Sequence, residues 1–176
     1  MKGYHYIKRG IDIILSGMAI VILSPLLLFL CIAIKLDTPG PILFKQKRVG
    51  IHRSFFQIYK FRTMRIDTPK DVPTHMLENP EQYITKVGKF LRKTSLDELP
   101  QIFNIFKGEM SIVGPRPALW NQDDLVAERE KYGANDVTPG LTGWAQINGR
   151  DELEIPDKAR LDGEYVKHLG PWMDLK

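Results

Sequence analysis

The longest hydrophobic pattern in the chain lies near its beginning. Between Ile13 and Ile34 the sequence holds 22 consecutive residues without a charged side chain, which is long enough for a membrane helix and too apolar for an ordinary surface helix. The chain then continues directly into Lys35, Leu36 and Asp37, with no small-residue cleavage site, so the segment lacks the pattern of a cleaved signal peptide. The pattern predicts a helix that enters a membrane.

A proline interrupts this segment near its middle. Pro25 has no N–H group and its ring clashes with the carbonyl of Val21, so we expect a kink there, where the Ser24 hydroxyl can satisfy the freed carbonyl. The arms on either side hold 12 and 10 residues, or about 18 and 15 Å of helix at about 1.5 Å per residue. Neither arm alone crosses a hydrocarbon core of about 30 Å.

Positive charges flank the apolar segment on both sides. They lie at Lys2, Lys8, Arg9, Lys35, Lys45, Lys47 and Arg48. Such charges are typical of the cytoplasmic side of a membrane, and a single straight span, the simplest alternative, would place one flank on the opposite side. We therefore expect a re-entrant, Pro-kinked membrane anchor over residues 1–36, with its kink at Ser24 and Pro25, and a domain packed on it over residues 37–176.

A strand-like alternation follows, in two runs bracketed by glycine and proline. Residues 42–49 and 55–64 are rich in aromatic and branched side chains, which predicts a β-hairpin with one cationic face. Lys60 and Arg62 are two positions apart and are expected on that face. A solvated strand face is the alternative explanation of these charges.

Helical periodicity appears in two later segments. Over residues 81–93 an apolar stripe lies opposite three lysines, with Arg92 near the end. This pattern is typical of a helix at a membrane interface, although packing in a protein core is the alternative. From Leu99 to Lys107 apolar residues recur at helical spacing and Gly108 follows, which predicts a core-facing helix that ends near Lys107.

The remaining chain predicts loops and two further helices. Residues 67–80 contain three prolines and predict a loop, while residues 138–150 are turn-rich, with three glycines that would let a ligand approach the backbone. Helical patterns occur over residues 120–132 and 159–169. With 176 residues, 43% of them hydrophobic, the chain is long enough for one domain. The expected fold is α+β: a mostly helical single domain with a small β-hairpin, the re-entrant helix and amphipathic interfacial helices.

Charge and motif content narrow the classes of function. The net charge of +4 and pI near 9.1 indicate an acidic partner, which is a membrane surface, a phosphorylated substrate or nucleic acid. The single cysteine, Cys31, excludes a disulfide framework, and the four histidines have no metal-ligand spacing. The sequence also lacks the P-loop, dinucleotide-binding and zinc-protease motifs.

Two adjacent acids are the strongest candidates for chemistry. Asp97 and Glu98 lie at the start of the predicted 99–107 helix, where Ser95, in a capping box with Glu98, or Asp97 itself is the N-cap. The first turn of a helix favours ionised carboxylates, and helix capping alone is the alternative role. Arg116 stands between two prolines, which hold its guanidinium at an angle suited to phosphate, unless the segment is only a surface turn.

Five segments carry motifs that occur together in one known family. They are the apolar segment with Ser24-Pro25, and residues 59–64 (YKFRTM), 95–101 (SLDELPQ), 114–117 (GPRP) and 139–146 (PGLTGWAQ). In content and order they resemble the bacterial sugar transferase family, the small monotopic phosphoglycosyl transferases, over nearly the whole chain. The sequence departs from the family pattern at Thr138, where members often carry a basic residue.

The resemblance implies transfer of a sugar 1-phosphate from a UDP-sugar to polyprenyl (undecaprenyl) phosphate, with release of UMP. This is the first membrane step in the synthesis of a capsule, an O-antigen or a glycoprotein glycan. It implies a catalytic domain over residues 37–176, on the cytoplasmic face of the bacterial inner membrane, with the lipid bilayer as a partner.

The resemblance also implies roles for single residues. Asp97 matches the nucleophile, which forms a covalent aspartyl-phosphosugar, and Glu98 matches the acid that assists it. Lys60, Arg92 and Arg116 match basic residues around the substrate phosphates. Mg²⁺ is the implied cofactor, with Asp97 as its candidate ligand, because the negative charge of a diphosphate must be neutralised before an anion can attack it.

Two other functions compete with this one. A non-catalytic membrane adaptor would bind anionic lipid through the same basic surfaces. A nucleic-acid binder is suggested by the pI alone, but the basic residues are interleaved with a membrane segment and no nucleic-acid motif is present. We therefore expect no nucleic-acid partner.

Overall fold

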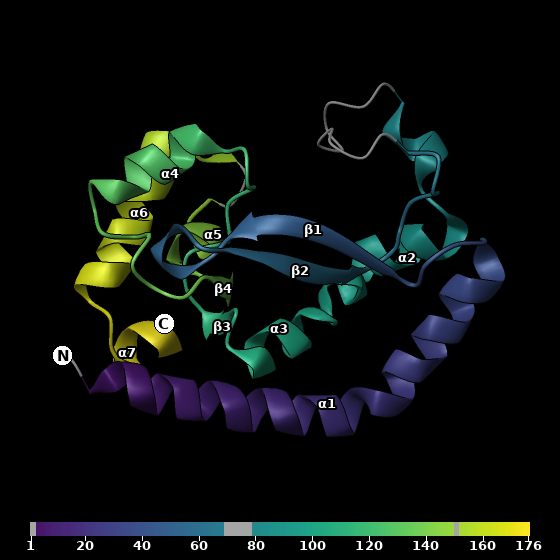
Figure 1. Ribbon diagram of the computed structural model, residues 1–176, viewed down its shortest axis with the longest axis horizontal. Coiled ribbons are helices and arrows are strands. Elements are labelled where there is room, and N and C mark those ends of the chain that lie inside the picture. Colours follow the sequence, from purple (N-terminus) through teal and green to yellow (C-terminus); the bar gives the residue numbers. More distant parts are fainter. Residues whose placement is uncertain (1–2, 69–78, 150–151) are drawn as a thin grey trace.

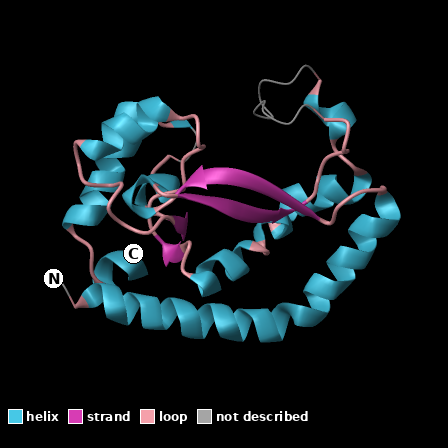
Figure 2. Ribbon diagram, in the orientation of Figure 1, coloured by secondary structure: helices cyan, strands magenta, loops and turns pink. Residues whose placement is uncertain are grey.

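The computed structural model describes residues 3–68, 79–149 and 152–176 of the chain. A long helix, α1 (Tyr4–Asp37), runs along one side of the rest of the molecule, which is called the body below (Figure 1). That body consists of short helices arranged around a central β-hairpin and a second small sheet (Figure 2). The expectation of a mostly helical α+β fold with a small hairpin is confirmed.

Helix α1 is continuous over 34 residues and contains Pro25 in its interior. Ser24 Oγ donates to the carbonyl of Val21 at 2.8 Å, which is the carbonyl that Pro25 leaves without its usual N–H donor. The helix changes direction along its length and curves around the body (Figure 1).

Both ends of α1 are held against the same body. Near its beginning, the Arg9 guanidinium donates to the carbonyls of Ile105 and Phe106 at 2.6 and 2.7 Å. At its end, the Asp37 carboxylate accepts the backbone N–H of Val87 at 3.1 Å. The middle of the helix therefore bridges two anchored ends.

The first turns of α1 also meet the last helix, α7 (Pro171–Leu175). The Asp174 carboxylate accepts hydrogen bonds from Tyr4 Oη at 2.7 Å, Lys8 Nζ at 2.6 Å and Tyr165 Oη at 2.8 Å. One partly buried carboxylate thus joins residues that are up to 170 positions apart.

Strands β1 (Leu43–Val49) and β2 (Phe55–Phe61) form the predicted antiparallel hairpin. Lys60 pairs with Phe44, so it lies on the same face of the hairpin as every second residue of β1, including Arg48. This face of the hairpin therefore carries the basic side chains of Lys60 and Arg48.

Arg62 lies beyond the end of β2 and does not extend this face. Its side chain is buried, and it donates from Nε to Pro41 O at 2.6 Å and from Nη2 to Thr38 O at 2.8 Å. The expectation of a shared cationic face for Lys60 and Arg62 is therefore wrong, because Arg62 satisfies backbone carbonyls between α1 and β1.

The predicted helix over residues 81–93 is divided. A 3₁₀ turn, η3 (Pro80–Tyr83), comes first, and Ile84 then forms a β-bridge. Helix α2 (Lys86–Thr94) begins only after Thr85, whose hydroxyl caps it by accepting a backbone N–H at 2.9 Å. The predicted helix therefore begins several residues before the observed one.

A second sheet was not predicted. It consists of two short parallel strands, β3 (Ser111–Val113) and β4 (Gly140–Thr142). With helix α5 (Trp144–Ile147), β4 occupies part of the segment predicted to be only turns. Most of the loop predicted over residues 67–80 lies outside the described residues.

The remaining elements connect these parts. They are η1 (Ile51–Arg53), η4 (Leu96–Glu98), α3 (Gln101–Lys107), α4 (Asp123–Glu130) and α6 (Ile155–Lys167). Helix α3 ends at Lys107 as predicted, and α4 and α6 confirm the two predicted later helices with shifted bounds.

The buried apolar residues form separate small clusters. One joins α1 to the hairpin and α2, a second lies between the hairpin and α3, and a third packs α4 against α6. Their buried members are Leu30, Ile34, Phe61 and Leu91; Phe56, Ile58, Ile105 and Met110; and Ala118, Leu125 and Ala159.

Most apolar side chains of α1 are exposed. They include Ile14, Val21, Ile22, Leu28 and Phe29, each more than half accessible. Within the described residues, α1 is the helix that is long and apolar enough to cross a membrane by length and composition. Because soluble proteins rarely expose an apolar surface of this extent, α1 indicates membrane association.

Candidate active site

The two candidate acids lie on η4, a separate turn between α2 and α3. Helix α2 is followed by Ser95, which has a left-handed φ of +56°, and η4 then carries Asp97 and Glu98. We expected both acids in the first turn of the helix that ends at Lys107, capped by Ser95 or Asp97. That expectation is wrong: Ser95 makes no side-chain cap, and Pro100 directly precedes α3, where its missing N–H costs no helical hydrogen bond.

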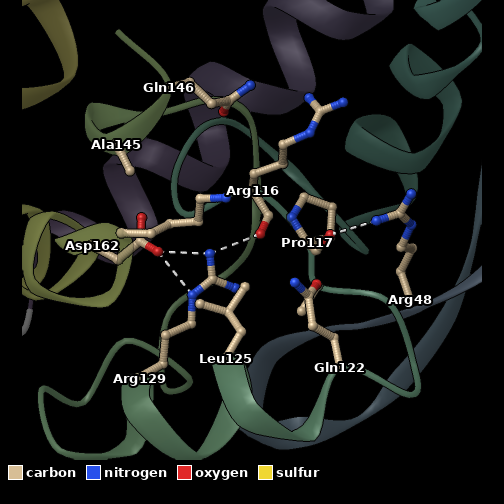
Figure 3. A pocket seen from close by; sticks show the side chains of 11 residues that line it. Arg48, Arg116, Pro117, Gln122, Leu125, Arg129, Ala145, Gln146 and Asp162 are labelled. Carbon is tan, nitrogen blue, oxygen red and sulfur yellow. Dashed lines mark hydrogen bonds and ion pairs between the residues drawn. The ribbon is translucent and has the colours of Figure 1, made fainter. Parts of the chain in front are cut away.

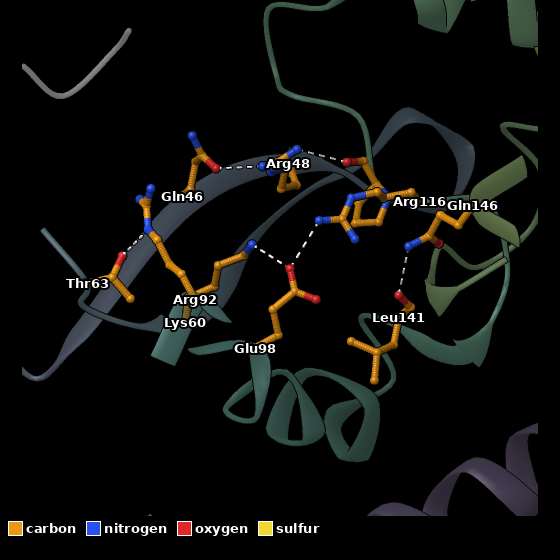
Figure 4. Close-up of polar contacts among 10 residues, drawn as sticks. Gln46, Arg48, Lys60, Thr63, Arg92, Glu98, Arg116, Leu141 and Gln146 are labelled. Carbon is orange, nitrogen blue, oxygen red and sulfur yellow. Dashed lines mark hydrogen bonds and ion pairs between the residues drawn. The ribbon is translucent and has the colours of Figure 1, made fainter. Parts of the chain in front are cut away.

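Glu98 contacts two of the cations predicted from the sequence (Figure 4). Its Oε1 accepts Lys60 Nζ at 2.8 Å and Arg116 Nη2 at 3.1 Å. Lys60 comes from β2, and Arg116 comes from the loop after β3. The turn, the hairpin and the loop thus converge on one carboxylate oxygen.

A buried ion pair fixes the backbone at Arg116. Arg129 of α4 lies 2.6 Å from the Asp162 carboxylate of α6, and both side chains are almost fully buried. The same guanidinium donates from Nη2 to the carbonyl of Arg116 at 3.0 Å. Sequence analysis did not identify Arg129 or this use of Asp162, because the two residues are 33 positions apart on different helices.

Glycines bring the two segments of the second sheet together around Arg116. A Cβ added at Gly140 or Gly143 would collide with the backbone of Gly114, so each of these positions requires glycine. The sequence led us to expect that these glycines admit a ligand to the backbone. In the structure, another stretch of backbone occupies that space at Gly140 and Gly143.

Arg92 lies on the other side of η4, the acid turn that carries Asp97 and Glu98. Its Nε donates to Thr63 Oγ1 at 2.9 Å, and it forms no ion pair with a described carboxylate. Burial lowers the pKa of Arg92, while the nearby negative charge of Asp97 acts in the opposite direction. Arg92 is thus a cation near these acids that no described carboxylate neutralises through a direct contact.

Asp97 makes no hydrogen bond or ion pair with another side chain in the described part of the chain. Burial raises its pKa above the ordinary value, Glu98 adds to that effect, and Lys60 and Arg92 oppose it. In the described part of the chain, no cation contacts the Asp97 carboxylate directly, whereas two cations contact that of Glu98.

The two adjacent acids consequently have different electrostatic environments. Burial by itself would raise the pKa of Glu98, but the charges and hydrogen bonds of Lys60 and Arg116 outweigh it, so the pKa is lowered. Glu98 is held as an anion by two cations, whereas burial makes the Asp97 carboxylate more basic than that of an ordinary aspartate. Opposite shifts in a neighbouring pair are typical of acids with separate chemical roles.

Arg48 is a further basic residue near the site that sequence analysis did not assign. Its Nη1 donates to Pro117 O at 3.0 Å, and its Nη2 donates to Gln46 Oε1 at 2.7 Å (Figure 4). The usable signal was the strand period, because Gln46, Arg48 and Lys60 lie on one face once the hairpin register is known.

Comparison with known proteins gives one consistent family. The sequence profile described as "Bacterial sugar transferase" matches residues 3–176. The chain is 41% identical over 183 aligned positions to the UDP-glucose:undecaprenyl-phosphate glucose-1-phosphate transferase of Escherichia coli (strain K12), covering 97% of this chain and 38% of that protein.

Two other relatives show the same similarity. A UDP-N-acetylgalactosamine-undecaprenyl-phosphate N-acetylgalactosaminephosphotransferase of Aeromonas hydrophila is 39% identical over 98% of this chain and 42% of its own length. The uncharacterized sugar transferase EpsL of Bacillus subtilis (strain 168) is 39% identical over 97% of this chain and 82% of its own length. The chain thus spans about two fifths of the first two relatives and most of the third.

Proposed function

Because the chain belongs to the bacterial sugar transferase family, we propose that it transfers a sugar 1-phosphate from a UDP-sugar to undecaprenyl phosphate and releases UMP. The observation that carries this proposal is the acid turn, where Glu98 holds Lys60 and Arg116 beside Asp97, which has no side-chain partner within the described residues. Such a group of cations can bind and neutralise a diphosphate.

The different environments of the two acids support a covalent route. An Asp97 carboxylate oxygen attacks the phosphorus that carries the sugar, the bond from that phosphorus to the bridging oxygen breaks, and its electron pair leaves with UMP. An oxygen of the polyprenyl phosphate then attacks the same phosphorus, and the Asp97 carboxylate leaves. The raised pKa of Asp97, caused mainly by burial, makes its oxygen more basic than that of an ordinary aspartate.

Glu98 is suited to a supporting role in this route. Its Oε1 is already the acceptor for Lys60 and Arg116, so it holds both cations in place. Arg92, whose hydrogen bond to Thr63 is to a neutral hydroxyl, keeps its charge available for a substrate phosphate.

Mg²⁺ fits this set of residues. The described residues contain no group of three His, Cys, Asp or Glu side chains that could hold a metal, and Mg²⁺ commonly binds through one or two carboxylates together with substrate phosphates. Among the described residues, no other side chain contacts the Asp97 carboxylate, so Asp97 is the candidate ligand. When bound, the ion would neutralise charge on the diphosphate.

The membrane topology belongs to the same proposal. A straight helix of 34 residues would be about 51 Å long at about 1.5 Å per residue, yet both ends of α1 contact the same body through Arg9 and Asp37. This supports a re-entrant helix that enters and leaves one face. With basic residues on both flanks, that face is the cytoplasmic one, where the exposed apolar side chains of α2 and α3, such as Phe90 and Phe106, would lie at the membrane interface.

The names of the relatives support the substrate classes. The Escherichia coli and Aeromonas hydrophila proteins are named for different sugars but the same undecaprenyl phosphate acceptor. A shared acceptor with a long prenyl tail requires chemistry at a membrane surface. We propose that this chain uses that acceptor and initiates a surface glycoconjugate such as a capsule, an O-antigen or a glycoprotein glycan.

The test is release of UMP from UDP-glucose and UDP-N-acetylgalactosamine by the purified protein in nanodiscs, with undecaprenyl phosphate and Mg²⁺. We expect repeated release of UMP from at least one of the two UDP-sugars when the acceptor is present. Without the acceptor, UMP release should stop after one turnover. Binding to anionic vesicles without UMP release from any UDP-sugar would favour the non-catalytic adaptor.

A further inference from the structure

A strongly basic cavity opens next to the acid turn, between the hairpin and helices α4, α5 and α6 (Figure 3). Four cations line it, but only one carboxylate does. The cations are Arg48, Arg116, Arg129 and Lys158, and the carboxylate is Asp162. A cavity with this lining is suited to an anion.

Two of these cations are already paired. Arg129 forms its ion pair with Asp162 at 2.6 Å, and Arg116 contacts Glu98 at 3.1 Å. Within the described residues, neither Arg48 nor Lys158 lies within 4.0 Å of a carboxylate oxygen. The excess positive charge of the cavity therefore resides on these two side chains.

The position of Arg48 is unfavourable without an anion. In the described part of the chain it donates only to neutral oxygens, those of Pro117 and Gln46, and its Nε is buried with no partner there. Burial and the charge of Arg116 lower the pKa of Arg48 to about 10, although Glu98 acts in the other direction. A partly buried cation is stabilised by an opposite charge that takes the place of water.

Arg116 connects this cavity to the acid turn. It contacts Glu98 on one side and lines the cavity on the other. Lys60, on the same hairpin face as Arg48, lies beside the acids. A diphosphate placed along this row of cations would have one phosphorus beside Asp97 and its other phosphate toward Arg48.

We propose that this cavity binds the UMP half of the sugar donor, with the departing phosphate held by Arg48 together with Arg116. The inference rests on the proposed function and assigns the leaving group its place. Lys158 supplies further positive charge. Gln122 and Gln146 also line the cavity, and their amides are the kind of group that pairs with the N–H and carbonyls of a pyrimidine base.

Exchange of labelled UMP into the donor tests this assignment. The full-length protein in nanodiscs is incubated with UDP-sugar and radiolabelled UMP, without acceptor. A UMP phosphate oxygen attacks the phosphorus of the aspartyl-phosphosugar, the Asp97 carboxylate leaves, and labelled UDP-sugar forms. The measured quantity is the UMP concentration that gives half-maximal exchange.

Arg48→Gln is expected to raise that concentration at least about tenfold, because a charge-assisted contact to phosphate is lost. The KM for undecaprenyl phosphate should change less than about twofold, since the acceptor reacts after UMP has left. Arg48→Lys keeps the charge without the planar fork, so its half-saturating UMP concentration should lie between those of wild type and Arg48→Gln. Lys45→Gln, on the other face of β1 and outside the cavity lining, is the matched control and should behave like wild type.

Lys158→Gln provides a second variant on α6 if Arg48→Gln does not fold, and it should raise the UMP concentration in the same direction. Unchanged half-saturation by UMP in folded variants at both positions, with normal exchange by wild type, would overturn the inference and leave the proposed function standing. Absence of exchange by the wild-type protein would instead contradict the covalent route itself.

Discussion

Glu98 Oε1 lies 2.8 Å from Lys60 Nζ, which joins the turn between α2 and α3 to the end of strand β2. This contact decides which of the two adjacent acids is available for chemistry. Glu98 is occupied as an acceptor, whereas Asp97 has no side-chain partner among the described residues.

Asp97→Asn should abolish turnover, with a loss of at least about 10³-fold, because an amide cannot serve as the nucleophile. Incubation of wild type with UDP-sugar alone should add one sugar phosphate to the peptide that contains Asp97, as measured by mass spectrometry. Glu98→Gln is the matched variant: it should turn over slowly yet still form the adduct. An adduct on any other residue would rule out Asp97 as the nucleophile.

The acid limb of the pH–rate profile should report Asp97. Because burial raises its pKa, activity should fall as the pH drops through a value above that of an ordinary aspartate. Lys60 opposes that shift, so Lys60→Met should move the acid limb to still higher pH. The profile of kcat/KM for the UDP-sugar measures this, with Lys45→Gln as control. A limb that stays in place in Lys60→Met would refute the assignment.

Arg116→Lys should lower kcat/KM for the UDP-sugar about tenfold or more, since lysine keeps the charge and loses the planar fork that binds phosphate. The Arg129 side chain donates to the backbone carbonyl of Arg116. Because this hydrogen bond does not involve the Arg116 side chain, the fold should survive. Thermal unfolding checks stability, and initial rates check activity. Wild-type rates in a folded variant would reduce Arg116 to a turn residue.

Asp162→Asn should destabilise the protein by about 3 kcal/mol or more, because it leaves the buried Arg129 without its counter-ion. Asp157→Asn is the control, since its ion pair with Arg160 is exposed and such pairs contribute about 1 kcal/mol or less. Denaturant unfolding in detergent measures both changes. Equal effects of the two substitutions would show that the buried pair does not stabilise this region.

Single cysteines at Gly3 and Pro39, in a Cys31→Ser background, should both react with an impermeant reagent from the cytoplasmic side only. Both positions are exposed and flank α1, and a re-entrant helix returns them to one face. Labelling from opposite sides of the membrane would establish a full span. Pro25→Ala, which straightens the helix, should shift a fraction of molecules toward that second pattern.

Elements that depend on residues close together in the sequence could be predicted from it. Alternating residues predicted the hairpin, and Gly108 predicted the end of α3, because strand period and C-terminal glycine act within a few positions. The helical stripe over residues 81–93 was less reliable. There the β-bridge of Ile84 and the cap at Thr85 outweighed the apolar period.

The parts of the site that depend on distant contacts were beyond local patterns. The β3–β4 pairing requires Gly140 to pass close to Gly114, and the anchoring of Arg116 requires the Arg129–Asp162 pair. Neither contact has a periodic signal in the sequence. Arg48 was counted only as a flanking charge, because its role becomes visible when the register places it near Arg116.

The hydrogen bonds at Asp174 have a consequence for biosynthesis. Tyr4 and Asp174 are 170 positions apart. At about 5–20 residues per second, the ribosome therefore adds Asp174 roughly 10–30 seconds after Tyr4. The apolar helix is therefore exposed long before its first turn can be fastened. We therefore expect the helix to contact lipid while the chain is nascent, before the body closes onto it.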